Sequence, residues 1–140
     1  LVVLMQAALG GLVSAGYAGL ACPGLACDAH GVPWSALDPW REPVLGAAGN
    51  VAGARLQLVH RAGALVVVAL LVPLALLAWR ARRRGAALAL LGLLALQCAL
   101  GVALVLGRLP LPAALAHNLA AVLLLLAVTE LAASGPARLR

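Results

Sequence analysis

Long apolar runs dominate this sequence, and polar or helix-breaking residues separate one run from the next. A membrane-spanning helix needs about 20 consecutive, mostly apolar residues, and the chain contains four runs of that kind. We expect spanning helices at residues 1–20, 55–79, 86–107 and 112–133, with a longer connecting segment at 21–54. The pattern therefore predicts an all-α, integral membrane four-helix bundle, with residues 1–140 forming a single transmembrane domain.

The composition supports a membrane protein and excludes two other classes. Hydrophobic residues make up 65% of the chain and charged residues only 10%, whereas a soluble domain carries about 25% charged residues. A disordered chain is excluded because such chains combine low hydrophobicity with high net charge. The ten basic residues, all arginine, give a formal net charge of +6. They do not line a folded basic face, so we expect membrane lipid and no nucleic acid as a partner.

The positions of the arginines predict the orientation of the chain in the membrane. Cytoplasmic loops of membrane proteins are enriched in arginine and lysine. Six arginines lie between the second and third spans or after the fourth, namely Arg80, Arg82, Arg83, Arg84, Arg138 and Arg140. We therefore expect a multi-pass protein of the cell membrane, with both termini cytoplasmic and residues 21–54 outside.

The two halves of the sequence resemble one another. Met5–Gly10 in the first span resembles Leu96–Gly101 in the third, and both contain the pattern Gln-x-x-Leu-Gly. Leu58–Ala64 in the second span resembles Leu115–Ala121 in the fourth, and both contain a histidine. The first and third spans run in the same direction, so we predict two helical hairpins related by a parallel repeat about an axis along the membrane normal.

His60 and His117 occupy matching places in this repeat, each about five residues into its predicted helix. At 1.5 Å per residue, both are expected roughly 7–8 Å below the outer helix ends, facing one another across the bundle. Two neutral imidazoles from separate helices suit six-coordinate haem iron. The glycine and alanine residues that flank them leave room for a flat macrocycle. Close helix packing is the alternative explanation, but ionisable groups at membrane depth favour a functional site.

Other polar residues are candidates to support such a site. Arg61 adjoins His60 at the outer interface, where a haem propionate needs a cationic partner. Arg55 and Arg108 lie near by, and interfacial snorkelling explains them equally well. Gln6 and Gln97 either orient a ligand or form hydrogen bonds between helices, and we favour the second interpretation.

Two of the three cysteines, Cys22 and Cys27, lie in the segment expected outside, a compartment that permits disulfides. The Pro-Gly pair between them allows the tight turn that a disulfide needs. The bond either shapes the loop above the haem edge or exchanges with a redox partner, and we favour the first. Cys98 in the third span is expected to be a packing residue. His30 in the outer segment is expected to be a solvated side chain rather than an iron ligand.

Together these segments resemble the haem A synthase family of cytochrome oxidase assembly proteins. Leu56–Arg61 resembles the family's histidine-arginine motif, and Leu109–Asn118 resembles its other histidine segment, where glutamine is usual at the last position. Gly19–Pro23 followed by Cys27 is similar to the family's outer-loop cysteine pair. The two Gln-x-x-Leu-Gly segments also fit, so the resemblance covers nearly the whole chain.

The resemblance implies a function in the oxidation of a methyl group of haem O to the formyl group of haem A. Typical members have eight helices in two halves, and half-size members exist. The half that handles substrate carries a glutamate three residues before its first histidine, where this chain has Gln57. The resemblance therefore implies the half that holds haem b, through His60 and His117, and leaves the catalytic residues of this chain unknown.

The same resemblance bears on partners. The chain begins with Leu rather than Met, so two arrangements stay open: an N-terminal half lies upstream, or the chain pairs with another copy as a homo-oligomer. Haem O, haem A, haem O synthase and cytochrome oxidase are the further partners that the resemblance implies.

Two other functions stay open. The first is a b-type membrane cytochrome, which would transfer electrons through the same two histidines without oxidising a porphyrin. The second is a membrane thiol oxidoreductase that uses Cys22 and Cys27. It is the weakest of the three, because the sequence has no Cys-x-x-Cys on a helix.

Overall fold

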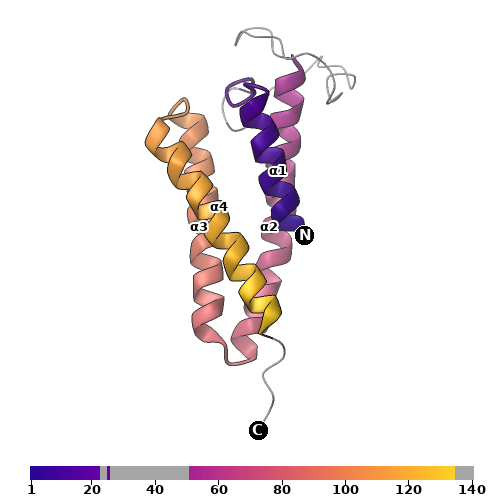
Figure 1. Cartoon of the computed structure of the whole chain (residues 1–140), viewed down its shortest axis with the longest axis vertical. Helices are drawn as coiled ribbons and strands as arrows, with labels where there is room; N and C mark the ends of the chain where they lie inside the picture. The colour runs from indigo at the N-terminus through magenta and orange to yellow at the C-terminus, as the bar shows by residue number, and fades with distance from the viewer. Residues whose placement is uncertain (23–24, 26–50, 135–140) are drawn as a thin grey trace.

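The computed structural model describes residues 1–22, 25 and 51–134. This part of the chain consists of four helices and their connecting turns, without strands (Figure 1). The helices are α1 (Val2–Ala15), α2 (Val51–Arg80), α3 (Arg84–Leu106) and α4 (Leu111–Ala133). The prediction of an all-α, four-helix bundle is confirmed.

Three of the described helices are long and apolar enough to span a membrane, over residues Gly53–Arg80, Arg84–Leu106 and Leu111–Ala133. The chain is therefore a multi-pass membrane protein. The first predicted span, 1–20, is helical only over the 14 residues of α1. Its helix ends at Gly16 because the next residue, Tyr17, has a φ of 51°, and this left-handed conformation does not continue a right-handed helix.

The second helix also differs from its predicted bounds. It begins at Val51 rather than at residue 55, so His60 is the tenth residue of its helix, whereas His117 is the seventh of α4. The expectation that both histidines lie about five residues into their helices is therefore wrong for His60 and close for His117, which lies six residues after the first residue of α4. The apolar run that predicted the second span begins at Arg55, but the small residues before it continue the helix.

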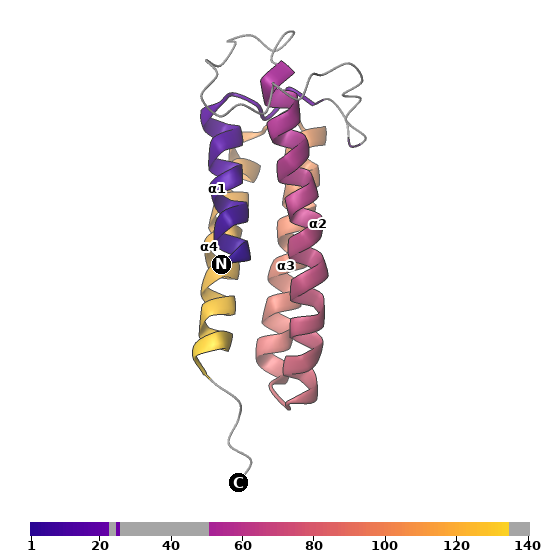
Figure 2. The ribbon, with the colours of Figure 1, turned by 90° about the vertical axis from the view of Figure 1, so that its right-hand side faces the viewer.

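The four helices form a ring in which neighbours in sequence are neighbours in space. The contacts join α1 to α2, α2 to α3 and α3 to α4, and α1 closes the ring against α4 (Figures 1 and 2). Within the described part of the chain, no contacts join α1 to α3 or α2 to α4. These two pairs are therefore the diagonals of the bundle, and the diagonal α2–α4 carries both spanning-helix histidines.

The bundle has an apolar core and an apolar outer surface. One buried cluster unites all four helices: Val3, Val67, Leu71, Ala75, Leu90, Leu94 and Leu124. Many large apolar side chains are exposed instead, for example Leu65 at 71% and Leu119 at 61%. A water-soluble surface does not carry such a continuous apolar covering, so these side chains are expected to contact lipid.

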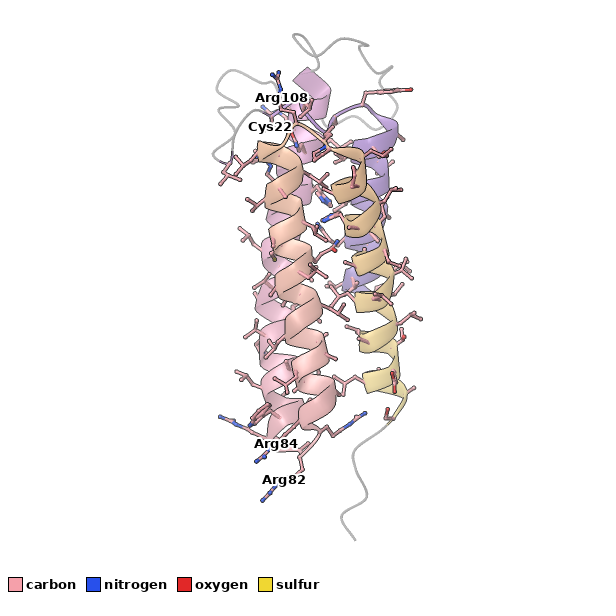
Figure 3. The ribbon with its side chains drawn as sticks, turned by 90° about the vertical axis from the view of Figure 1, so that its left-hand side faces the viewer. Cys22, Arg82, Arg84 and Arg108 are labelled. Carbon is pink, nitrogen blue, oxygen red and sulfur yellow. The ribbon has the colours of Figure 1, made fainter. Side chains whose placement is uncertain are left out.

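The charged residues lie at the two ends of this apolar body. Arg82 and Arg84 are at one end, near the turn between α2 and α3, and Cys22 and Arg108 are at the other (Figure 3). Arg83 Nη1 donates to the carbonyl oxygen of Leu131 at 3.3 Å, which ties the α2–α3 turn to the end of α4. Arg138 and Arg140, on which the predicted orientation also depends, lie outside the described residues.

Candidate functional site

Gln6 on α1 and His60 on α2 form the first of two glutamine–histidine pairs. Gln6 Nε2 lies 3.1 Å from His60 Nδ1 and donates to the backbone carbonyl oxygen of His60 at 2.8 Å. An amide nitrogen carries two hydrogens and does not act as an acceptor, so it donates in both contacts. The two contacts hold the Gln6 amide against the ring and the backbone of the same histidine.

Gln97 on α3 and His117 on α4 form the second pair. Gln97 Nε2 lies 3.2 Å from His117 Nε2. Both glutamines of the repeated Gln-x-x-Leu-Gly pattern therefore contact the histidine of their own hairpin. The sequence favoured hydrogen bonds between helices over contacts that orient a ligand. The structure contains those bonds between helices, and their partners are the two histidines.

The glycines of the same pattern lie against the same histidines. A Cβ atom added to Gly10 would lie 3.1 Å from His60 Cε1, and one added to Gly101 would lie 3.6 Å from His117 Cε1. Glutamine and glycine are four residues apart, so they share one helix face. The sequence prediction missed these glycine contacts. The signal that could have shown them is that shared face, which faces the histidine-bearing helix in both hairpins.

The two pairs meet across the bundle. His60 and His117 belong to the diagonal helices α2 and α4, while their glutamine partners belong to the other diagonal. The two imidazoles lie close enough to interact electrostatically. The structure therefore brings together His60 and His117, the two residues that the sequence paired through its repeat.

This layer of the bundle contains polar atoms that the protein alone leaves unsatisfied. Among the described residues, buried atoms without a hydrogen-bond partner include Gln6 Oε1, Gln97 Oε1 and His117 Nδ1. Most buried polar atoms in native proteins have a partner. The apolar core cluster lies beyond this layer, towards the end that carries Arg82 and Arg84. The glutamine–histidine layer is therefore a polar site within the apolar bundle.

The composition of this layer limits the kind of metal group that fits it. In the part of the chain that the structure describes, no three histidine, cysteine or acidic side chains cluster to hold a metal ion. A bare ion such as zinc takes four ligands, but haem iron receives four nitrogens from its own macrocycle. Two histidines and small neighbours thus suit a haem better than a bare ion.

Two residues beside His60 contact the polypeptide that follows α1. Gln57 is 4% exposed, and its Nε2 donates to the carbonyl oxygen of Gly19 at 2.6 Å. Arg61 Nη1 donates to Leu25 O at 3.0 Å, and its Nη2 donates to Cys22 O at 2.9 Å. The side chain of Arg61, predicted to contact a haem propionate, therefore holds the backbone above His60.

The remaining predicted residues are placed as follows. Cys22 is buried and lies at the Arg108 end of the bundle (Figure 3). Its predicted partner, Cys27, and His30 lie outside the described residues. Cys98 is exposed on the bundle surface, so the prediction that it packs inside the bundle is wrong. Its neighbour Gln97 points to His117, and the next residue along a helix is turned away from that face by about 100°.

The residue pattern of the cytochrome oxidase assembly protein family matches residues 1–129 of the chain. The chain belongs to the haem A synthase family of cytochrome oxidase assembly proteins. It is similar to a haem A synthase of Shewanella oneidensis, with 34% identity over 143 residues. This match covers 93% of the chain and 42% of that relative, so the chain spans less than half of the relative's length. No solved structure matches it.

Membership of the haem A synthase family indicates which chemical group to compare with the glutamine–histidine layer. The family's name implies that haem is involved, and the layer holds the two spanning-helix histidines, small residues and unsatisfied polar atoms. These features fit a haem held between the helices.

Proposed function

We propose that this chain is a haem b-binding, four-helix unit of haem A synthase type, in which His60 and His117 would hold the haem iron. The observation that carries the proposal is the repeated unit of glutamine, glycine and histidine, which presents one imidazole from each diagonal helix. A bound haem would supply an iron that takes up and releases single electrons between two imidazoles. The chain would take part in the oxidation of haem O to haem A during cytochrome oxidase assembly.

The surroundings of His60 support a haem-holding role rather than the oxidation itself. Gln57, at the position where the resemblance implies a catalytic glutamate, donates to Gly19 O and lacks an ionisable group. The acidic side chain in the described part of the chain is Glu130, near the end of α4 that lies away from the histidines. Gln57 therefore holds the segment after α1 and supplies no carboxylate at this position.

The first experiment measures haem content and coordination in the purified full chain. We expect the wild type to give a six-coordinate b-type spectrum in reduced-minus-oxidised difference measurements. The variants His60→Ala and His117→Ala should each lose it. His30→Ala is the matched control and should keep it, because His30 is not part of the sequence repeat that contains His60 and His117. A wild type without haem, or haem coordination that survives both substitutions, would overturn the proposal.

A b-type cytochrome that only transfers electrons is the second candidate, and the absence of a carboxylate at residue 57 favours it. The two functions differ in the fate of the porphyrin. The full chain would be supplied with haem O, oxygen and a reductant, and its pigments would be extracted. Formation of haem A by this chain supports the enzyme, whereas unchanged haem O in a chain that cycles its own haem b supports the cytochrome.

We also propose that Cys22 and Cys27 form a disulfide on the outer side of the cell membrane, above His60. The buried position of Cys22 and the bond from Arg61 to its carbonyl oxygen support a structural role. Replacement of both cysteines by serine should then leave haem in place and preserve electron transfer. A variant that keeps its haem but loses all activity would favour the thiol oxidoreductase instead.

A further inference from the structure

We propose that the turn between α2 and α3 binds the headgroup of an anionic phospholipid. The site consists of the basic cluster, which we define as Arg80, Arg82 and Arg84, together with Trp79 and the start of α3. It lies at the end of the bundle opposite Cys22 and Arg108 (Figure 3). It is separate from the glutamine–histidine layer, so this inference does not depend on the proposed function.

The basic cluster concentrates positive charge that no acidic side chain neutralises. Four of the five residues Arg80–Arg84 are arginine, and the three residues of the basic cluster are exposed. In the part of the chain that the structure describes, no ion pair joins them to an acidic side chain. Arg83 differs from them, because it donates to the carbonyl oxygen of Leu131. Like charges this close together repel one another, so a bound anion would stabilise the turn.

Arg84 is held in one orientation by an aromatic ring. Its guanidinium carbon lies 5.4 Å from the centroid of the Trp79 ring, and Trp79 is 43% exposed. Arginine stacks on aromatic faces and binds phosphate through parallel N–H groups, which lysine does not. Tryptophan is enriched at the headgroup level of membranes. Arg84 is therefore oriented at the depth where lipid phosphates lie.

The start of α3 adds backbone donors beside Arg84. The helix begins at Arg84, and the side chain of its N-cap residue, Arg83, makes no capping hydrogen bond. The first N–H groups of a helix have no partner within it, and this end carries a partial positive charge that favours anions. A Cβ atom on Gly85 would meet no other atom within 4 Å. The space beside these donors is therefore open to a headgroup.

Arg82 occupies a backbone position where glycine is usual. The end of α2 is closed by two hydrogen bonds, from Arg82 N–H to Trp79 O at 3.1 Å and from Arg83 N–H to Ala78 O at 2.9 Å. These are the two bonds of a Schellman motif, whose left-handed residue is usually glycine. Here that residue is Arg82, with a φ of 61°. Its strain is consistent with a side chain that binds a ligand.

The apolar surface next to the basic cluster favours a lipid over a free phosphate ion. Leu77, three residues before Arg80, is 61% exposed, and Leu88, four residues after Arg84, is 58% exposed. Residues three or four apart lie on one helix face, so exposed apolar side chains adjoin the charges on both helices. A phospholipid matches this surface with its acyl chains and the basic cluster with its phosphate. Arginine clusters at the ends of spanning helices are typical of anionic lipid sites.

Native mass spectrometry of the purified full chain in neutral detergent tests this binding without involving membrane insertion. Phosphatidylglycerol should be retained in preference to phosphatidylcholine with the same acyl chains. Arg84→Gln should weaken phosphatidylglycerol binding about fivefold, as expected for one arginine near a lipid surface. Arg108→Gln is the matched control, because it removes an exposed arginine from the other end of the bundle. Equal binding of the two lipids, or equal losses in the two variants, would overturn the inference.

Substitution of Trp79 separates a built site from attraction by charge alone. Trp79→Leu changes no charge but removes the ring under Arg84, so it should weaken phosphatidylglycerol binding about threefold. Trp79→Phe keeps an aromatic face and should retain most of the affinity. If Trp79→Leu binds the lipid as tightly as the wild type, charge alone accounts for the binding and the proposed site is wrong.

Glycine at the two left-handed arginines provides a second measurement. Both Arg82→Gly and Arg108→Gly should raise the unfolding temperature in neutral detergent without lipid, because both relieve left-handed strain. Added phosphatidylglycerol should raise it further in the wild type and in Arg108→Gly, but much less in Arg82→Gly. Inorganic phosphate should have little effect on any of the three. A full lipid effect in Arg82→Gly, or the same effect from inorganic phosphate, would overturn the inference.

Discussion

At the scale of single residues, the two hairpins repeat the same unit of glutamine, glycine and histidine, but the space between glycine and histidine differs. Gly10 and Gly101 both lie against Cε1 of a histidine ring, but the space for a Cβ atom differs. A contact of 3.1 Å, as at Gly10, is tighter than ordinary packing, whereas 3.6 Å, as at Gly101, is an ordinary van der Waals contact. The ring of His60 is therefore more closely confined than the ring of His117.

This difference predicts unequal effects of a matched pair of substitutions. Gly10→Ala should push the His60 ring away and lower haem occupancy several-fold, because added methyl groups in a packed site cost about 1–3 kcal/mol. Gly101→Ala should change haem occupancy less than about twofold, since its methyl group meets His117 at an ordinary distance. Haem per protein, measured as the pyridine haemochrome, compares the two variants. Equal losses would show that ring confinement does not distinguish the hairpins.

At the scale of the elements, α1, α2 and α3 are each followed within two residues by a residue in the left-handed conformation. Between α3 and α4, Arg108 and Leu109 have φ values of 57° and 62°. This conformation costs a residue other than glycine roughly 1–2 kcal/mol. The side chain of Leu109 is 41% exposed but lies against Gly19, where a Cβ atom would be 2.7 Å from its Cδ1. Arg108 is exposed at the end of the bundle (Figure 3).

From the α3–α4 turn we therefore expect different outcomes for two neighbouring substitutions by glycine. Arg108→Gly should stabilise the chain by about 1 kcal/mol, because it removes the left-handed strain without removing a packed side chain. Leu109→Gly should give no gain, because the loss of packing against Gly19 offsets the relief of strain. Thermal unfolding in detergent measures both variants. A lower unfolding temperature for Arg108→Gly than for the wild type would contradict this explanation.

The elements also show how far the sequence predicts this structure. The apolar runs predicted the bounds of α3 and α4 to within two residues, because arginine and proline residues separate these runs from their neighbours. The end of α1 was not predicted, because the apolar run continues to Leu20 and gives no sign of the left-handed conformation that Tyr17 adopts. The start of α2 was not predicted because small residues precede Arg55 and carry no helix-start signal.

The site was predicted in part, for a different physical reason. The repeat paired His60 with His117, and the structure brings them together. The repeat did not identify the histidines as the hydrogen-bond partners of the two glutamines, because these contacts depend on which face of each helix points inward. A helix that is apolar on all sides has no polar stripe to mark its outward face, so the rotation of α1 and α3 could not be derived from the pattern.

At the scale of the whole molecule, the few charges separate to the two ends of an apolar body. Arg82 and Arg84 occupy one end, and Arg84 lies over the ring of Trp79 at 5.4 Å from its centroid. Arg108 occupies the other end, with the segment after α1 (Figure 3). Enrichment of arginine on the cytoplasmic side predicts that the α2–α3 turn is inside the cell and the α3–α4 turn outside.

Labelling of single cysteines tests this orientation without changing any charge. In a background with Cys22, Cys27 and Cys98 replaced by serine, Ala81→Cys marks the α2–α3 turn and Leu111→Cys marks the start of α4, both at exposed positions. A membrane-impermeant thiol reagent added to whole cells should label the cysteine at 111 and not the one at 81. Labelling of the cysteine at 81 alone would show that the orientation is the reverse of the predicted one, with the histidines nearer the cytoplasmic side.

The central claim for the whole molecule is that the bundle presents two histidines, one from each hairpin, to one haem iron. Rescue by free imidazole tests it most directly, because only a missing ligand can be replaced by a small ligand in solution. His60→Gly and His117→Gly should each lose the six-coordinate spectrum and regain it when imidazole is added, whereas His30→Gly should match the wild type throughout. A six-coordinate spectrum that persists in either spanning-helix variant without imidazole, or one that imidazole does not restore, would contradict ligation by that histidine.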